Sequence, residues 1–302
     1  MEYQDVALID SHYTLMLFCL LYPDKVGKTL FIVSDGVSDS VRKNLENCIY
    51  LADTKYCRLR KTREILRNIK YIVTPQFRQL RKLSNIHFYG QDHAWFSFIG
   101  KNKPFTLLED GLDNYVRAPS TGIKRKLLSY FGTPYLEMGR SDNVYQIQLT
   151  GIFPIPEDIK NKVNIVDIKS QWEGLGQEAK NFISHLFMNK VQLSKIANLQ
   201  CKDSALIITQ PLDQDGIISV EQKINYYLDA VSRVEGVKEV WFKRHPRDDT
   251  NYDALGWKEL GFTDCPIELL SQLGLEFKYV ITYNSTAIYR FPKEKRITAV
   301  LK

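Results

Sequence analysis

The 302-residue chain lacks the marks of a secreted or membrane-inserted protein. Residues 1–25 have no basic start, and Asp10, Ser11 and His12 interrupt their apolar stretch. Neither a signal peptide nor a membrane-spanning helix fits this pattern. We therefore expect a cytoplasmic protein.

Cysteine is also scarce, and several familiar motifs are missing. The five cysteines are scattered and form no C-x-x-C pair and no ligand-spaced set with histidine. This argues against a disulfide framework and against a zinc site. The chain has no G-x-G-x-x-G, no G-x-x-x-x-G-K-[ST] and no H-E-x-x-H, so dehydrogenase, kinase-type and metalloprotease functions lose their usual support. We also expect no transferase that depends on a D-x-D motif.

What is present is the composition of a soluble globular protein, 44% hydrophobic and 25% charged, with length enough for two domains. Short apolar runs rich in β-formers alternate with helical patterns. The predicted strands lie at residues 6–10, 29–36, 48–52, 86–90, 163–168, 204–210, 239–246 and 279–285. Continuous apolar strands separated by helices imply parallel sheets covered on both faces, an α/β fold.

These strands fall into two series, which suggests two doubly wound domains. Between the series lies GIFPIPEDIKNK at residues 151–162, which carries two prolines and a polar run. Such a segment is the best candidate for a hinge. We therefore predict an N-terminal domain of residues 1–155 and a C-terminal domain of residues 156–302.

The net charge of +6 is unevenly distributed. Residues 58–82 contain nine basic side chains against the single acid Glu64. A solvated helix face, contact with an anionic membrane surface and nucleic-acid binding would each use such charges. No recognised nucleic-acid motif or aromatic-interleaved platform accompanies them, so we expect no nucleic acid and keep the first two interpretations open.

Ligands of open parallel sheets bind beyond the carboxyl ends of the strands, so polar residues that follow a strand are candidates for chemistry. FTLLEDGLDNY at residues 105–115 is an apolar strand that ends in Glu109, Asp110 and Gly111. The glycine permits a turn that brings the backbone close to a ligand. One carboxylate would be a general base and the other an orienting group or helix N-cap, and a plain Asp-Gly turn is the structural alternative.

A second candidate follows the strand in EVWFKRHPRDD at residues 239–249. Pro246 holds His245 in an extended conformation and ends the strand. The flanking Lys243 and Arg244 are cations suited to phosphate. An ordinary surface histidine is the alternative interpretation.

Two more segments have both a structural and a functional interpretation. Ser285 and Thr286 stand between the strand at residues 279–285 and a predicted helix, where hydroxyls and helix-start amides favour an anion but also serve as ordinary caps. Glu268 lies in the first turn of a helix that Pro266 begins. It complements the helix dipole, and it is also well placed to accept hydrogen bonds from ribose hydroxyls.

In chain order, E-D-G at 109–111, H-P at 245–246 and S-T at 285–286 resemble the three short motifs shared by bacterial sialyltransferases. The N-terminal segment, the stretch Thr209-Gln210-Pro211 and the compact length look most like glycosyltransferase family 52, the lipooligosaccharide and capsule sialyltransferase family. Glu268, between the H-P and S-T motifs, also fits.

The resemblance implies a GT-B fold, with two Rossmann-like domains facing a central cleft. It implies transfer of N-acetylneuraminic acid from CMP-N-acetylneuraminic acid to a galactose-terminated oligosaccharide. It favours an α2,3 linkage and a place in surface polysaccharide or lipooligosaccharide synthesis. It allows a homodimer, and it calls for no cofactor and no metal, because protein donors can neutralise a monophosphate leaving group.

The resemblance also assigns roles to the candidate residues. Glu109, the first acid of the motif, would be the base, and His245 would protonate or hydrogen-bond the departing phosphate. Glu268 would hold the cytidine ribose. The remaining predicted substrate-binding residues are Asp110, Gly111, Gln210, Pro211, Lys243, Pro246, Ser285 and Thr286.

Three alternatives stay open at this stage. The first is a transferase of the same fold that uses another nucleotide sugar. The second is a non-catalytic basic protein at the membrane surface, for which Glu109 would be dispensable and residues 58–82 essential. The third is a sugar-nucleotide epimerase of similar two-domain build, which needs no acceptor.

Overall fold

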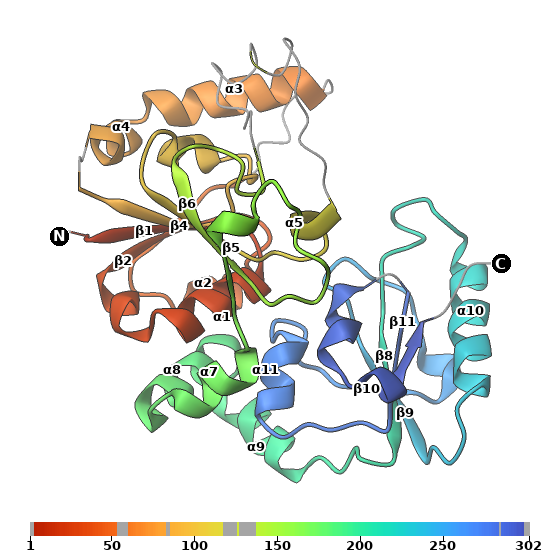
Figure 1. Ribbon diagram of the computed structural model, residues 1–302. Helices are drawn as coiled ribbons and strands as arrows, with labels where there is room; N and C mark the ends of the chain where they lie inside the picture. The colour runs from red at the N-terminus through yellow and green to blue at the C-terminus, as the bar shows by residue number, and fades with distance from the viewer. Residues whose placement is uncertain are drawn as a thin grey trace. The chain divides into compact units, whose positions relative to one another are not determined.

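The computed structural model describes residues 3–52, 60–82, 85–116, 126, 137–283 and 285–298 (Figure 1). Cys57, Arg58 and Asn284 lie outside these residues. The chain divides into two compact units, Met1–Leu186 and Phe187–Lys302. Each unit is built on its own parallel sheet, as predicted.

The first unit holds a sheet in which seven described strands are all parallel, in the order β3-β2-β1-β4-β5-β6-β7. Reversal of the order at β1 makes the sheet doubly wound. The strands are β1 (Asp5–Ile9), β2 (Thr29–Val33), β3 (Cys48–Tyr50), β4 (His87–Gly90), β5 (Phe105–Leu108), β6 (Val144–Leu149) and β7 (Val163–Ile165).

Helices cover both faces of this sheet (Figure 1). The described helices of this unit are α1 (His12–Leu21), α2 (Asp39–Arg42), α3 (Arg60–Val73), α4 (Pro75–Lys82), α5 (Asp113–Val116), α7 (Ile168–Gly174) and α8 (Gln177–Phe187). Short 3-10 segments are η1 (Pro23–Lys28), η2 (Ser97–Gly100) and η3 (Lys160–Lys162).

Successive side chains along a strand point to opposite faces of the sheet, so each face packs against its own layer of helices. Leu8 packs in one apolar cluster with Phe77 of α4. On the opposite face, the ring of Phe31 lies 5.3 Å from that of Phe18 of α1. Gly90 ends β4 with a φ of 112°, and a Cβ there would meet the Leu8 carbonyl oxygen at 2.0 Å, so only glycine fits.

The division between the units falls later than the predicted boundary at 155/156. β7 pairs with β6, with Val163 opposite Ile147, and therefore completes the first sheet. Residues 151–162 connect these two strands instead of forming a hinge between domains. Helix α7 contacts α1 and extends the first unit further still.

The second unit holds a sheet of five described parallel strands in the order β10-β9-β8-β11-β12. The strands are β8 (Ser204–Ile208), β9 (Glu239–Lys243), β10 (Lys258–Glu259), β11 (Tyr279–Thr282) and β12 (Arg296–Thr298). The helical segments are α9 (Lys190–Asn198), α10 (Val220–Ser232), α11 (Ile267–Gln272), η4 (Asp253–Leu255), η5 (Thr286–Arg290) and η6 (Lys293–Lys295).

Helix α10 shows how sequence sets an element boundary here. Ser219 caps its first turn through a capping box with Gln222, which satisfies two backbone amides. Tyr227 and Ala230 on its inner face join the apolar core with Phe242 of β9. In the part of the chain that is described, no helix is long and apolar enough to cross a membrane.

Candidate active site

Polar side chains follow four neighbouring strands of the first sheet, at the edge where ligands of such sheets bind. β1, β4, β5 and β6 are adjacent, and each ends in a loop that begins with a polar residue. These residues are Asp10 and Ser11 after β1, Gln91, Asp92 and His93 after β4, Glu109 and Asp110 after β5, and Thr150 after β6.

Glu109 is fully buried, and several donors hold its carboxylate. The Tyr115 hydroxyl donates to Oε2 at 2.7 Å, and Thr150 Oγ1 lies 2.6 Å from Oε2 and 2.9 Å from Oε1. The Tyr13 hydroxyl lies 3.3 Å from Oε1. This carboxylate therefore fastens the loop after β6 to the end of β5, and its oxygens face protein donors.

Asp110 is in a different environment, with 27% of its side chain exposed. Oδ1 accepts from the hydroxyls of Ser11 at 2.8 Å and Thr14 at 3.3 Å. Oδ2 accepts from Nε2 of His93 at 3.2 Å. The backbone amide of Asp110 donates to Asn114 Oδ1 at 2.8 Å. The side chain is thus held in one orientation while part of it reaches solvent.

His93 lies between two carboxylates. Its Nε2 contacts Asp110, and its Nδ1 lies 3.9 Å from Oδ1 of Asp92. Burial by itself lowers the pKa of His93, but Asp110 and Asp92 outweigh it and raise this pKa to about 9. Burial likewise opposes the ionisation of Asp110, yet the hydrogen bond from His93 brings the pKa of Asp110 below its ordinary value. At neutral pH the two form an ion pair.

Asp10, Asp92, Glu109 and Asp110 lie at the same edge of the first sheet, which we call the acidic edge. Oδ1 of Asp10 accepts from the Ser34 hydroxyl and, at 3.3 Å, from the Gly36 amide. Burial, with a further contribution from the charge of Asp110, raises the pKa of Asp10. The sequence interpretation did not identify Asp10 or His93 as candidate site residues; Asp10 directly follows β1, and His93 is the third residue after β4.

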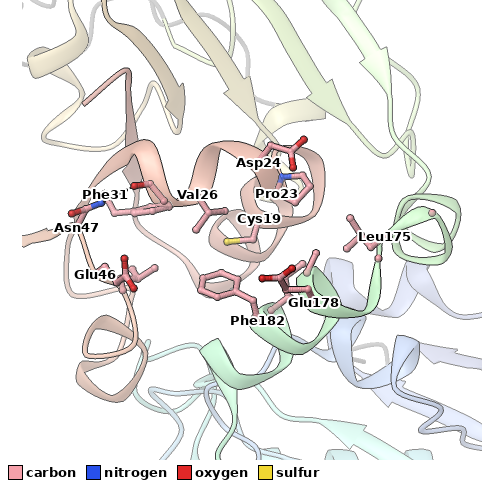
Figure 2. A pocket seen from close by; sticks show the side chains of 16 residues that line it. Cys19, Pro23, Asp24, Val26, Phe31, Glu46, Asn47, Leu175, Glu178 and Phe182 are labelled. Carbon is pink, nitrogen blue, oxygen red and sulfur yellow. Dashed lines mark hydrogen bonds between the residues drawn. The ribbon is translucent and has the colours of Figure 1, made fainter. Parts of the chain in front are cut away.

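The same unit has a hollow of about 640 Å³, shown in Figure 2. Apolar side chains such as Cys19, Phe31 and Phe182 line it, and Asp24, Glu46 and Glu178 also line it. Its loop residues precede β2 and β3, at the amino ends of the strands. This hollow is therefore separate from the acidic edge.

In the second unit, three neighbouring strands carry six of the predicted residues in the loops after their carboxyl ends. Gln210 and Pro211 follow β8, His245 and Pro246 follow β9, and Ser285 and Thr286 follow β11. The His245 amide donates to Thr209 Oγ1 at 3.0 Å, which links the first two loops. These six residues thus lie along one edge of the second sheet.

The imidazole of His245 has a defined proton position. The Arg247 amide donates to Nδ1 at 3.1 Å, so the neutral ring carries its proton on Nε2. Burial, followed by the cations Arg247 and Lys243, lowers the pKa of His245. At neutral pH His245 is therefore a neutral ring with an Nε2–H donor.

The cations beside His245 are arranged differently from the sequence prediction. Lys243 is buried, and its ammonium donates to the Thr263 carbonyl at 3.3 Å, while burial lowers its pKa. Arg244 donates to Glu259 at 3.1 Å. Arg247, which the sequence interpretation did not single out, is 63% exposed and pairs with Asp215 at 2.7 Å. Arg247 is the most exposed of these three cations.

Glu268 and the S-T motif are connected through one arginine. Glu268 is buried in the first turn of α11, and Arg290 of η5 lies 3.8 Å from its Oε1. The predicted helix after Ser285 is the short 3-10 segment η5, and the Ser285 side chain makes no capping hydrogen bond. The Ser285 hydroxyl therefore does not cap η5.

The loop after β8 contains a D-x-D spacing, Asp213 and Asp215, which the sequence interpretation passed over. Asp213 pairs with the buried Lys223 of α10, which also contacts Asp248 at 2.9 Å. Asp215 pairs with Arg247. Both carboxylates of the spacing are thus neutralised by protein cations.

Comparison with known proteins decides the family. Residues 37–301 match the sequence profile of glycosyltransferase family 52. The chain belongs to this family. The matched region contains every predicted site residue of both sheet edges. An uncharacterised protein of Haemophilus influenzae is similar to this family 52 protein, with 34% identity over 217 residues, which cover 71% of this chain and 68% of that one.

Solved structures show that the family 52 protein has the GT-B type of fold. One similar structure is a 2,6-sialyltransferase of Photobacterium sp. JT-ISH-224 in complex with CMP and lactose, with a TM-score of 0.64 and 12% identity over 97% of this chain and 70% of that one. Another is the UDP-GlcNAc 2-epimerase of Neisseria meningitidis, with a TM-score of 0.53 and 10% identity over 94% and 78%. One fold therefore serves both reactions, and the fold alone does not choose between them.

Proposed function

We propose that this family 52 protein is an inverting sialyltransferase. It would transfer N-acetylneuraminic acid from CMP-N-acetylneuraminic acid to a terminal galactose, in an α2,3 linkage, during surface polysaccharide or lipooligosaccharide synthesis in the cytoplasm. The proposal is carried by one observation: the E-D-G, H-P and S-T motifs all stand at the carboxyl ends of parallel strands, in a chain of this family. The similar 2,6-sialyltransferase, bound to CMP and lactose, supports the choice of donor and acceptor class.

We assign the general base to Asp110 and not to its neighbour. A base must reach the acceptor hydroxyl, and Asp110 has an exposed side-chain fraction of 27% whereas Glu109 is fully buried. In the reaction, Asp110 takes the hydroxyl proton as the acceptor oxygen attacks the anomeric carbon. The bond from that carbon to the phosphate breaks on the opposite face, and its electron pair leaves with CMP, which inverts the anomeric centre.

Glu109 then supports the base instead of acting as one. Its contacts with Tyr115 and Thr150 order the loops after β5 and β6. His93 performs a related task, because its charge keeps Asp110 ionised and its Nε2–H fixes the carboxylate. These two residues position Asp110 without touching the acceptor.

The second unit would bind the donor. His245 donates its Nε2–H to the departing phosphate, and Arg247 contributes a positive charge. The hydroxyls of Ser285 and Thr286 add hydrogen bonds to the same phosphate, and Glu268 accepts from the ribose. Gln210, Pro211 and Pro246 border the nucleotide. These donors support a reaction that needs no metal ion.

A panel of nucleotide sugars tests this proposal and separates it from its rivals. The full chain is incubated with CMP-N-acetylneuraminic acid, UDP-N-acetylglucosamine, UDP-galactose or UDP-glucose, each with and without lactose, and nucleotide release is measured. We expect CMP release that depends on lactose. Consumption of a UDP-sugar with lactose would identify another transferase, and conversion of a UDP-sugar without lactose would identify an epimerase. Absence of turnover with every donor would favour a non-catalytic scaffold.

A further inference from the structure

Helix α3 of the first unit exposes an apolar stripe to solvent. Leu66, Ile69 and Val73 have exposed fractions of 58%, 40% and 49%. At about 100° per residue these three positions lie within roughly 60° of one another around the helix axis. Large apolar side chains that gather on one exposed face are characteristic of an interaction surface.

The opposite face of α3 fixes the helix to its unit, so the stripe cannot turn inward. The guanidinium of Arg67 stacks on the ring of Trp95 at 3.9 Å. The ring of Tyr71 lies 5.5 Å from that of Trp95 and 5.9 Å from that of Phe77 of α4. Arg67 and Asn68 are buried. One side of α3 therefore packs against the first unit, and the side with Leu66, Ile69 and Val73 faces solvent.

Exposed basic side chains lie on α3 and on the helix that follows it. Lys70 is exposed next to Ile69, and Arg78 and Lys82 are exposed on α4, which directly follows α3 (Figure 1). Phe77 and Leu80 point into the core, so the basic residues occupy the outer side of α4. Residues 58–82 carry nine basic side chains and one acid.

We infer that this surface binds an anionic phospholipid membrane; Leu66, Ile69, Val73, Lys70, Arg78 and Lys82 define it as the α3–α4 surface. The apolar side chains would enter the boundary between headgroups and acyl chains, and the cations would contact lipid phosphates. Charge complementarity selects this occupant, because basic side chains flank the apolar ones on adjacent helices. A folded protein partner would need about 800 Å² of surface on each side, more than one three-residue stripe supplies. The inference does not depend on the reaction that the protein catalyses.

Vesicle flotation tests this inference on the full chain. Two vesicle types are used, phosphatidylcholine alone and phosphatidylcholine mixed with phosphatidylglycerol. We expect the protein to float with the mixed vesicles only, and to be released progressively as salt is added, because salt screens the charges.

Two triple variants separate the apolar and the basic parts. Leu66→Gln/Ile69→Gln/Val73→Gln and Lys70→Gln/Arg78→Gln/Lys82→Gln should each lower the bound fraction at least tenfold, with unchanged circular dichroism. Matched controls are Val191→Gln on α9, whose side chain is 66% exposed, and Lys160→Gln/Lys169→Gln/Lys202→Gln at exposed lysines elsewhere. Both controls should bind like the wild type.

Four outcomes would overturn the inference. They are absence of binding to the mixed vesicles, equal binding to phosphatidylcholine alone, binding that neither α3–α4 variant lowers, and equal loss in the controls. Retention on duplex DNA without vesicle binding would assign the charges to nucleic acid instead.

Discussion

Nε2 of His93 lies 3.2 Å from Oδ2 of Asp110, and the imidazole has a second carboxylate, Asp92, 3.9 Å away on its other side. His93 is therefore protonated at neutral pH, because the two carboxylates stabilise its positive charge although the side chain is buried. This ion pair keeps Asp110 ionised and oriented at the edge of the sheet. Glu109 differs from Asp110 in that it is fully buried and accepts hydrogen bonds from the hydroxyls of Tyr115 and Thr150.

Substitution at the two acids should separate catalysis from support. Asp110→Asn should lower kcat for transfer by about 10²- to 10⁴-fold, because it removes the proton acceptor and keeps the shape. Its unfolding free energy at neutral pH should fall by about 1–3 kcal/mol, because His93 loses the carboxylate with which it pairs. Steady-state kinetics and calorimetry measure both quantities.

Glu109→Gln is the matched comparison. The amide adds donors where Tyr115 and Thr150 already donate, so we expect a loss of about 1–3 kcal/mol in unfolding free energy. A folded Glu109→Gln protein without activity, beside an active Asp110→Asn protein, would return the role of base to Glu109.

The free energy of unfolding of the first unit should depend on pH because His93 titrates. Folding raises the pKa of His93 from 6.5 to about 9, so its contribution is complete below pH 6.5 and disappears as the pH rises through about 9. Relative to His93→Gln, the wild type should lose up to about 3 kcal/mol over this interval. Urea unfolding at a series of pH values measures the difference. A difference that stays constant between pH 6 and 10 would rule out the charged imidazole.

Much of the fold was predictable because the strands are continuous apolar runs. β1, β2, β8 and β11 fall where the sequence indicated. The strand at β7 was predicted, but the sheet that it joins was not predictable, since Val163–Ile165 is a three-residue edge strand whose sheet is decided by its partner β6. Local sequence does not state which sheet such a strand joins.

The site was predictable in part for a similar reason. The E-D-G and H-P motifs could be found because each directly follows a recognisable strand. The relation of Asp110 to His93 and Ser11 could not, because β1, β4 and β5 become neighbours only in the folded sheet. Nor does the sequence say which of two adjacent acids turns inward. The hydroxyls of Tyr115 and Thr150 decide it, because they donate hydrogen bonds to the carboxylate of Glu109.

Lys223 should matter for both stability and donor binding. It is fully buried between Asp213 and Asp248, in the loops that follow β8 and β9. Lys223→Met would leave these carboxylates without their cation, so we expect a loss of about 3–5 kcal/mol. The KM for the donor should rise as the loops loosen. Lys238→Met, at an exposed pair with Asp203, is the control and should change neither quantity. Equal effects of the two substitutions in calorimetry and kinetics would contradict the assignment.

Removal of divalent metal should leave the reaction unchanged. Asp213 and Asp215 are paired with Lys223 and Arg247, and in the proposed mechanism His245 and Arg247 would supply the donors for the leaving phosphate. Transfer rates in excess EDTA should therefore equal those without it. A loss of activity in EDTA that Mg²⁺ or Mn²⁺ restores would show that the D-x-D spacing binds a metal after all.

The most direct test of the account is the identity and anomeric configuration of the product formed from CMP-N-acetylneuraminic acid and lactose. NMR of the purified product, with parallel measurement of CMP, gives both. The account predicts one sialyllactose for each CMP released, with the configuration at the anomeric carbon inverted relative to the donor, and a loss of this product in Asp110→Asn. A product with retained configuration, or no sialyllactose while another nucleotide sugar is consumed, would contradict it.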